Sequence, residues 1–139
     1  MRVVARRKAS GANRPSGFAH EVEIEGGHSL VVDEPVDVGG TDAGPSPTRL
    51  LASALASCIA ITMEMYAEHK GWELGVVEVG VDVEYDGQIP KSFAASIRLP
   101  EDLDDEQRER LLVVARKCPV HKALKGEANV SVSDRIESL

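Results

Sequence analysis

Two cysteines, Cys58 and Cys118, are the side chains of this sequence best suited to carry chemistry. A thiolate can attack a peroxide to give a sulfenic acid, and a second thiol can condense with that acid to a disulfide. The two cysteines fall on the apolar faces of two predicted helices. If these helices pack together, the pair could perform this redox cycle, and the apolar surroundings would select a hydrophobic organic hydroperoxide.

Each cysteine also has a simpler interpretation. Cys58 has apolar helical neighbours, and a free cysteine often serves as a small buried hydrophobe. Cys118 immediately precedes Pro119 and the start of another predicted helix, where backbone N–H groups favour a thiolate, and His121 follows three residues later. Cys118 and His121 could also form half of a zinc site, but no paired spacing supplies the other two ligands. We therefore predict neither a metal nor a cofactor.

The charge balance excludes one class of partner. The chain has 139 residues, with 16 Lys and Arg against 23 Asp and Glu, a net charge of −7. Such a chain has no basic excess to displace the counterions of nucleic acid, so we expect no nucleic-acid partner. Two cysteines also exclude a disulfide-stapled miniprotein.

The ends and apolar stretches of the chain suggest where it works. Arg2, Arg6, Arg7 and Lys8 are not followed by the apolar segment of a secretory signal, so we expect a cytoplasmic protein. The longest apolar run, residues 50–63, is shorter than the roughly 18 residues that a membrane span needs. We expect it to be a buried core helix, with no membrane partner.

Periodicity and turn residues predict the element order βββ-α-ββ-αα-β. Ser46 and Pro47 are typical of a helix start, and Gly71 of a helix end, which predicts a long helix from Pro47 to Lys70. A long Gly- and Pro-rich loop, residues 33–47, precedes it, and loops of this length are often functional. The remaining elements are predicted as strands over residues 3–7, 19–24, 29–32, 76–85, 93–99 and 128–133, and as helices from Asp102 or Asp104 to Cys118 and over residues 120–125. We therefore predict one α+β domain over residues 1–139, with antiparallel sheets packed against the long helix.

Two motifs resemble a known family. The segment Pro45-Ser-Pro-Thr-Arg-Leu-Leu-Ala-Ser-Ala-Leu-Ala-Ser-Cys58, followed by Cys118-Pro-Val-His-Lys-Ala-Leu124, is similar to the OsmC/Ohr family of osmotically inducible and organic-hydroperoxide-resistance proteins. The resemblance covers nearly the whole chain. It implies an intertwined homodimer with antiparallel sheets wrapped around two central helices, and two active sites at the subunit interface. It also implies a metal-free and haem-free peroxidase in which Cys58 is the nucleophile, Cys118 is the resolving cysteine, and a dithiol, often a protein-bound lipoyl group, is the reductant.

The helix start departs from the family pattern. Well-studied members read Asn-Pro-Glu-Glu or Asn-Pro-Glu-Gln there, and the glutamate pairs with an arginine that holds the thiolate; this chain has Ser46-Pro47-Thr48-Arg49. Arg14 matches the family arginine by approximate location, and Arg49 could supply a guanidinium from the helix. The departure leaves an alternative hypothesis: a catalytically weak OsmC-like protein that senses redox state or binds a small molecule.

Overall fold

The computed structural model describes residues 1–7 and 17–138. Contacts between residues divide the chain into two compact units, Met1–Leu51 and Ala52–Leu139. Each unit is described by itself. The mixed α+β class predicted from the sequence is confirmed, with antiparallel sheets in both units and a long helix between sheets in chain order.

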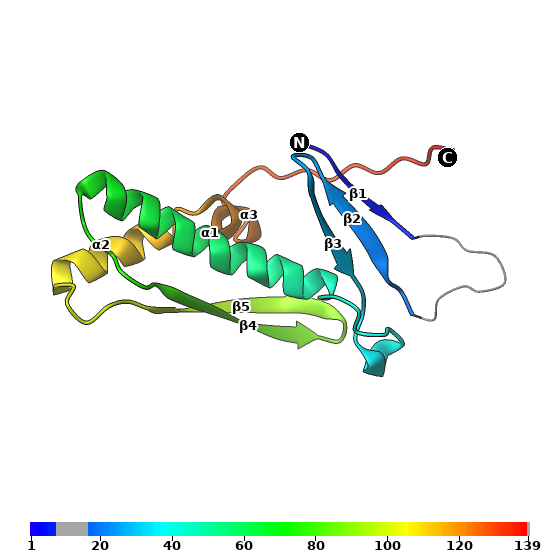
Figure 1. Ribbon diagram of the computed structural model, residues 1–139, viewed down its shortest axis with the longest axis horizontal. Helices are drawn as coiled ribbons and strands as arrows, with labels where there is room; N and C mark the ends of the chain where they lie inside the picture. Colours follow the sequence, from blue (N-terminus) through cyan, green and yellow to red (C-terminus); the bar gives the residue numbers. More distant parts are fainter. Residues whose placement is uncertain (8–16, 139) are drawn as a thin grey trace. The chain divides into compact units, whose positions relative to one another are not determined.

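The first unit contains a three-stranded antiparallel meander (Figure 1). Strand β1 (Val3–Arg6) pairs with β2 (His20–Ile24), and β2 pairs with β3 (His28–Val32). The turn between β2 and β3 uses two glycines with positive φ, as its sequence predicted. All three predicted N-terminal strands are therefore confirmed.

A buried carboxylate organises the loop that follows β3. Asp33 is 2% exposed and accepts hydrogen bonds from the backbone N–H groups of four residues and from the Thr41 hydroxyl, at 2.6–3.3 Å. The backbone donors belong to Phe18, Glu34, Thr41 and Ala43. The hydroxyl of Thr41 contributes most to holding the pKa of Asp33 well below its usual range, and burial opposes this effect without overcoming it. The loop is therefore an ordered structure built around one anion.

Close backbone contacts fix the same loop. It contains a single turn of 3-10 helix, η1 (Val36–Val38). A Cβ atom on Gly40 would lie 1.7 Å from the carbonyl oxygen of Glu34, and one on Gly44 would lie 2.1 Å from that of Val31. No side chain can be accommodated at either position without moving the backbone.

Helix α1 (Pro47–Lys70) has the bounds that its sequence predicted. The Arg49 backbone N–H donates to the Ser46 hydroxyl at 3.4 Å, as expected of a helix cap, and Gly71 follows the helix with φ +68°. Four residues spaced by four form its buried row: Leu55, Ile59, Met63 and Ala67. The prediction of a core helix is thus confirmed for one face, whereas Ile61 and Met65 are 53% and 66% exposed.

The apolar stretch of α1 is longer than the predicted 14 residues. An 18-residue window has mean hydropathy 1.6, so α1 is long and apolar enough to cross a membrane by length and composition alone. Helices of a protein core also meet this criterion. The buried row of α1 packs against sheet and helices of its own unit, as described next.

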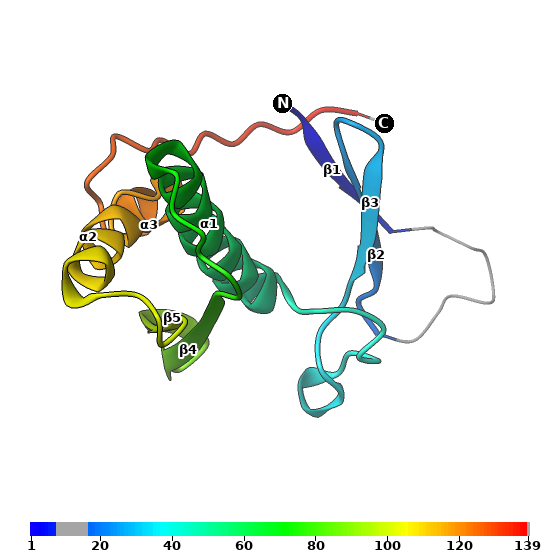
Figure 2. The ribbon, with the colours of Figure 1, turned by 60° about the vertical axis from the view of Figure 1, so that its left-hand side comes forward.

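The rest of the second unit packs along α1 (Figures 1 and 2). Strands β4 (Glu78–Asp86) and β5 (Ile89–Arg98) form an antiparallel hairpin whose turn contains Gly87, and they contribute Val79, Val81, Phe93 and Ile97 to the core. Helix α2 (Asp105–Ala115) begins at a capping box between Asp104 and Gln107 and buries Leu111 and Ala115. Helix α3 (Pro119–Leu124) follows after a short break.

Two predictions about the C-terminal part are corrected. The second helix ends at Ala115, three residues before Cys118, because Cys118 serves instead as the N-cap of α3. The strand predicted for residues 128–133 does not form, since a strand needs a neighbouring strand to share its backbone hydrogen bonds and no described strand pairs with this segment. The Val130 N–H bonds locally to the Ala128 carbonyl, and Val132 is 85% exposed.

Candidate functional site

Cys58 is placed by the central part of α1. It lies twelve residues into a 24-residue helix and is partly buried against the core cluster. Its backbone carbonyl accepts a hydrogen bond from the Thr62 hydroxyl at 2.7 Å, in addition to the helix ladder. The thiol is therefore held on a rigid element and is still accessible in part.

Cys118 is placed by the junction between α2 and α3. Its side chain is 0% exposed, and its Sγ atom accepts a hydrogen bond from the His121 backbone N–H at 3.3 Å. The Val120 backbone N–H also donates to this sulfur. This arrangement arises because Pro119 starts α3 at its first position and leaves the next N–H groups directed at the capping residue.

The structure brings the two cysteines together, although 60 positions separate them in the sequence. The Cys58 thiol is close enough to Cys118 to raise the pKa of its thiol, and both thiols are free. Burial is the largest cause of a raised pKa for Cys118, the Cys58 thiol raises that pKa further, and the two backbone donors oppose the change. Two thiols this close together are the arrangement that disulfide formation through a sulfenic acid requires.

A small cavity is formed by residues of α1, β5 and α3 with its C-cap, and neither Cys58 nor Cys118 is among its lining residues. Its volume is about 170 Å³, and its walls include Leu55, one helical turn before Cys58, and His121, three residues after Cys118. The other lining residues are Lys91, Ser92, Phe93, Leu124 and Lys125. The Nδ1 atom of His121 is buried and has no hydrogen-bond partner among the described residues.

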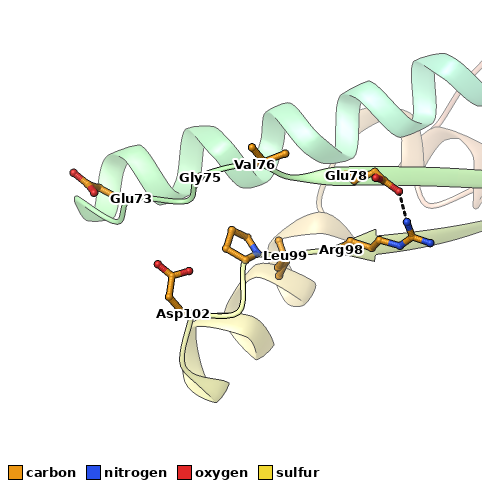
Figure 3. A pocket seen from close by; sticks show the side chains of 8 residues that line it. Glu73, Gly75, Val76, Glu78, Arg98, Leu99 and Asp102 are labelled. Carbon is orange, nitrogen blue, oxygen red and sulfur yellow. Dashed lines mark hydrogen bonds and ion pairs between the residues drawn. The ribbon is translucent and has the colours of Figure 1, made fainter.

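A larger cavity in the same unit has a different character. It has a volume of about 460 Å³ and lies between the segment after α1 and the end of β5, and neither cysteine lines it. Figure 3 shows the Arg98 guanidinium reaching Glu78, a 2.8 Å ion pair, at one side of this cavity, and Asp102 on the other. Its open, charged walls offer no nucleophile, so we place the candidate chemistry at the cysteines.

Of the two arginines expected near Cys58, only Arg49 lies among the described residues. Arg14 lies outside the described residues. Arg49 is 59% exposed and forms an ion pair with Asp42 at 3.4 Å. It precedes Cys58 by nine residues in α1, and nine residues of α-helix rise about 13.5 Å, so its place in the helix does not bring the guanidinium to the thiol. An activating role for either arginine stays a prediction.

Metal-ligating side chains are also dispersed. Across residues 1–7 and 17–138, no group of three or more His, Cys, Asp or Glu side chains is arranged to hold a metal ion. Cys118 and His121, considered above as half of a zinc site, interact instead through a backbone N–H and the sulfur.

The sequence did not reveal two parts of this arrangement. Asp33 was treated as the start of a loop, and its role as an acceptor of five hydrogen bonds depends on donors up to 15 residues away. Lys91 and Phe93 come to the cavity from β5, far in sequence from either cysteine. For Asp33, the only local signal in the sequence was Thr41, eight residues later. For Lys91 and Phe93, there was no local signal in the sequence.

Comparison with known proteins places this geometry in a family. The family model described as OsmC-like protein matches residues 40–133, more than half of the chain. The chain belongs to the OsmC-like family. The match spans both cysteines, the helix α1 that carries one, and the junction that carries the other. None of the curated proteins compared with the chain matches it.

Solved structures share the OsmC-like fold. A protein of Psychrobacter arcticus described as a putative osmotic stress induced and detoxification response protein superposes with TM-score 0.73 at 21% identity, covering 87% of this chain and 85% of its own. An organic hydroperoxide resistance protein OsmC of Legionella pneumophila gives 0.58 at 24% identity, with 91% and 90% covered. The organic hydroperoxide resistance protein OhrB of Bacillus subtilis gives 0.55 at 26% identity, with 90% of each chain covered.

Proposed function

We propose that this OsmC-like protein is a thiol-dependent peroxidase that reduces organic hydroperoxides. The observation that carries the proposal is that Cys118 lies in the apolar core cluster and Cys58 packs against that cluster, close enough for the two thiols to interact. Family membership and the hydroperoxide resistance named for two structural neighbours agree with this chemistry.

The difference in exposure between the two cysteines supports their proposed roles. Cys58 is partly exposed, so a peroxide can reach its sulfur, whereas Cys118 is 0% exposed. The Cys58 thiolate attacks the terminal oxygen of the hydroperoxide, the O–O bond breaks, and the alkoxide takes up a proton to leave as an alcohol. The resulting Cys58 sulfenic acid condenses with the Cys118 thiol to give a disulfide and water. A dithiol, of the lipoyl type, then reduces the disulfide and is itself oxidised.

The proposed reaction requires a group that stabilises the Cys58 thiolate. A thiolate needs an opposite charge at about 4–6 Å, and a guanidinium from Arg14 or Arg49 remains our proposal for that charge. We also propose that these chains work as cytoplasmic homodimers, because the exposed apolar residues Ile61 and Met65 of α1 leave a face that a second copy would cover. In a dimer the arginine of one copy can serve the cysteine of the other.

The proposal is tested by peroxide consumption with purified, reduced protein, cumene hydroperoxide and dihydrolipoamide. We expect turnover by the wild type, none by Cys58→Ser, and a single turnover by Cys118→Ser that leaves a sulfenic acid trapped by dimedone and detected by mass spectrometry. Lys122→Ala, a change on the exposed side of α3, is the matched control. Wild-type turnover by Cys58→Ser would overturn the proposal.

The second candidate is a redox-sensing or small-molecule-binding protein with slow turnover. It is favoured by Thr48 and Arg49 at the position of the family glutamate, and by the pairing of Arg49 with Asp42. In that case one equivalent of hydroperoxide would oxidise the pair to a disulfide, but added dithiol would not sustain turnover. The ratio of peroxide consumed to protein therefore separates the two candidates.

A further inference from the structure

The step at which Cys118 reacts poses a chemical problem. Only a thiolate attacks sulfur, and burial together with the Cys58 thiol holds the pKa of Cys118 above its ordinary value. A fully buried neutral thiol must therefore lose its proton at the moment of attack, and bulk water does not reach it. Some group close to this sulfur has to take the proton.

His121 is the titratable residue whose backbone is held at this sulfur. Its backbone N–H already contacts the Cys118 sulfur at 3.3 Å, which fixes the residue beside the reacting atom. Its Nδ1 atom is buried without a partner among the residues that the structure describes. A neutral imidazole with its hydrogen on Nε2 presents Nδ1 as an acceptor, and an unpartnered buried acceptor is unfavourable until a donor reaches it.

We propose that His121 accepts the Cys118 proton through Nδ1 when this sulfur attacks Cys58. The inference rests on the thiol–disulfide cycle of the proposed function. The proton leaves Cys118 for Nδ1, the Cys118 thiolate attacks the sulfur of the Cys58 sulfenic acid, the S–S bond forms, and the S–O bond breaks. The leaving hydroxide takes the proton from the imidazolium and departs as water. Thiol and sulfenic acid thus give disulfide and water, and His121 is regenerated.

Two charged side chains line the cavity that His121 also lines. They are Lys91 on β5 and Lys125, the C-cap of α3, which pairs with Glu127 at 3.1 Å; α1 contributes the apolar Leu55. No carboxylate lines this cavity within the described part of the chain.

An experiment with dithiobis(nitrobenzoate) isolates the step without any peroxide. The Cys58 thiolate attacks this disulfide reagent, forms a mixed disulfide and releases one coloured thiolate. Cys118 then attacks the Cys58 sulfur and releases the second, which leaves as a stable anion and needs no returned proton. The rate of the second release therefore reports removal of the proton from Cys118.

Three variants with distinct expectations test His121. Near neutral pH we expect the second release to slow by at least about 10-fold in His121→Asn and His121→Ala, and not in Lys122→Ala. The deficit should vanish above the pKa of the thiol, where solvent hydroxide replaces the base, and added imidazole should restore His121→Ala at neutral pH. A merely structural role would not be repaired by pH or by imidazole.

Two results would overturn the inference: a second release in His121→Asn as fast as in the wild type, or a deficit that persists at alkaline pH in a variant with the wild-type circular dichroism spectrum. Peroxide turnover is measured in parallel. A wild type that shows the His121 effect but consumes no hydroperoxide would refute the proposed function and leave the proton transfer standing.

Discussion

Asp33 and Cys118 are both buried acids, one in each unit of the chain, and the structure treats them in opposite ways. Asp33 has its pKa lowered, so it stays charged, whereas Cys118 has its pKa raised, so it stays neutral. The two side chains are about equally inaccessible, at 2% and 0% exposure. Burial alone therefore does not decide the protonation state.

The difference lies in the donors that each acid meets. Asp33 accepts five hydrogen bonds, four from backbone N–H groups and one from the Thr41 hydroxyl, which together outweigh desolvation. Cys118 accepts two backbone N–H groups, and its other neighbour is a thiol that favours the neutral form. In the first unit, the Asp33 carboxylate stays charged and holds a loop. In the second unit, the Cys118 thiol keeps its proton until a reaction removes it.

The largest expected effect is on thermal stability and follows from removing the Asp33 carboxylate. Asp33→Ala leaves five donors unpaired in a buried place, so we expect thermal unfolding, followed by circular dichroism, at a temperature lower by more than about 5 °C. Asp37→Ala is the matched control, because Asp37 is exposed in the same loop, and should shift unfolding by about 2 °C or less. Equal shifts in the two variants would show that the hydrogen bonds of Asp33 contribute nothing.

The dependence of stability on pH should differ in direction between the two acids. A lowered pKa means that stabilisation by Asp33 is complete above about pH 4 and is lost as pH falls. A raised pKa means that stabilisation by neutral Cys118 is complete below about pH 8.5 and is lost as pH rises. Urea unfolding over a pH series should show a flatter acid limb in Asp33→Asn and a flatter alkaline limb in Cys118→Ser. A variant that flattens the opposite limb would contradict this account.

A smaller effect should follow from removing the neighbour of the thiol. Cys58→Ala takes away the hydrogen bond and the charge that raise the pKa of Cys118, so that pKa should fall towards its ordinary value while remaining raised by burial. Ultraviolet absorbance of the thiolate against pH measures it in a chain with one remaining cysteine. Cys58→Ser keeps a hydrogen-bonding hydroxyl, so the pKa of Cys118 in this variant should lie between the values in the wild type and in Cys58→Ala. An unchanged pKa of Cys118 in Cys58→Ala would mean that the two side chains do not interact.

The smallest expected effect concerns an exposed carboxylate. Asp104 accepts one backbone N–H, from Gln107 at 2.7 Å, and caps α2 at the surface. Asp104→Ala should lower the free energy of unfolding by about 1 kcal/mol, as measured by urea denaturation. A loss as large as that of Asp33→Ala would mean that the number of donors is not what separates the two carboxylates.

Local signals predicted the elements that need no distant partner. The bounds of α1 followed from Ser46, Pro47 and Gly71, and the β4–β5 turn from Gly87, because caps and turns are decided within a few residues. The segment 128–133 alternates like a strand, yet pairing is a tertiary property and it found no described neighbour. The end of α2 was misplaced for a related reason, since Cys118 caps the next helix instead of continuing the last.

The candidate site was predictable in part. Helix faces and two motifs singled out Cys58 and Cys118, and the packing of α1 against the α2–α3 junction does bring them together. The groups around them come from other elements: Lys91 of β5 lines the cavity that His121 also lines, and the Val120 and His121 N–H groups reach Cys118 through the geometry of the α3 cap. No spacing in the sequence encodes those distances.

The two glycines wedged against carbonyl oxygens in the Asp33 loop have a consequence for how this protein will appear in a mutational scan. Because any Cβ on Gly40 or Gly44 collides with the backbone, nearly every substitution at these two positions should score as damaging. Neither glycine carries chemistry. A map of positions that do not tolerate substitution would thus mark the Asp33 loop as strongly as Cys58 and Cys118. Assays that measure protein abundance separately from activity will distinguish positions needed for folding from positions needed for the reaction.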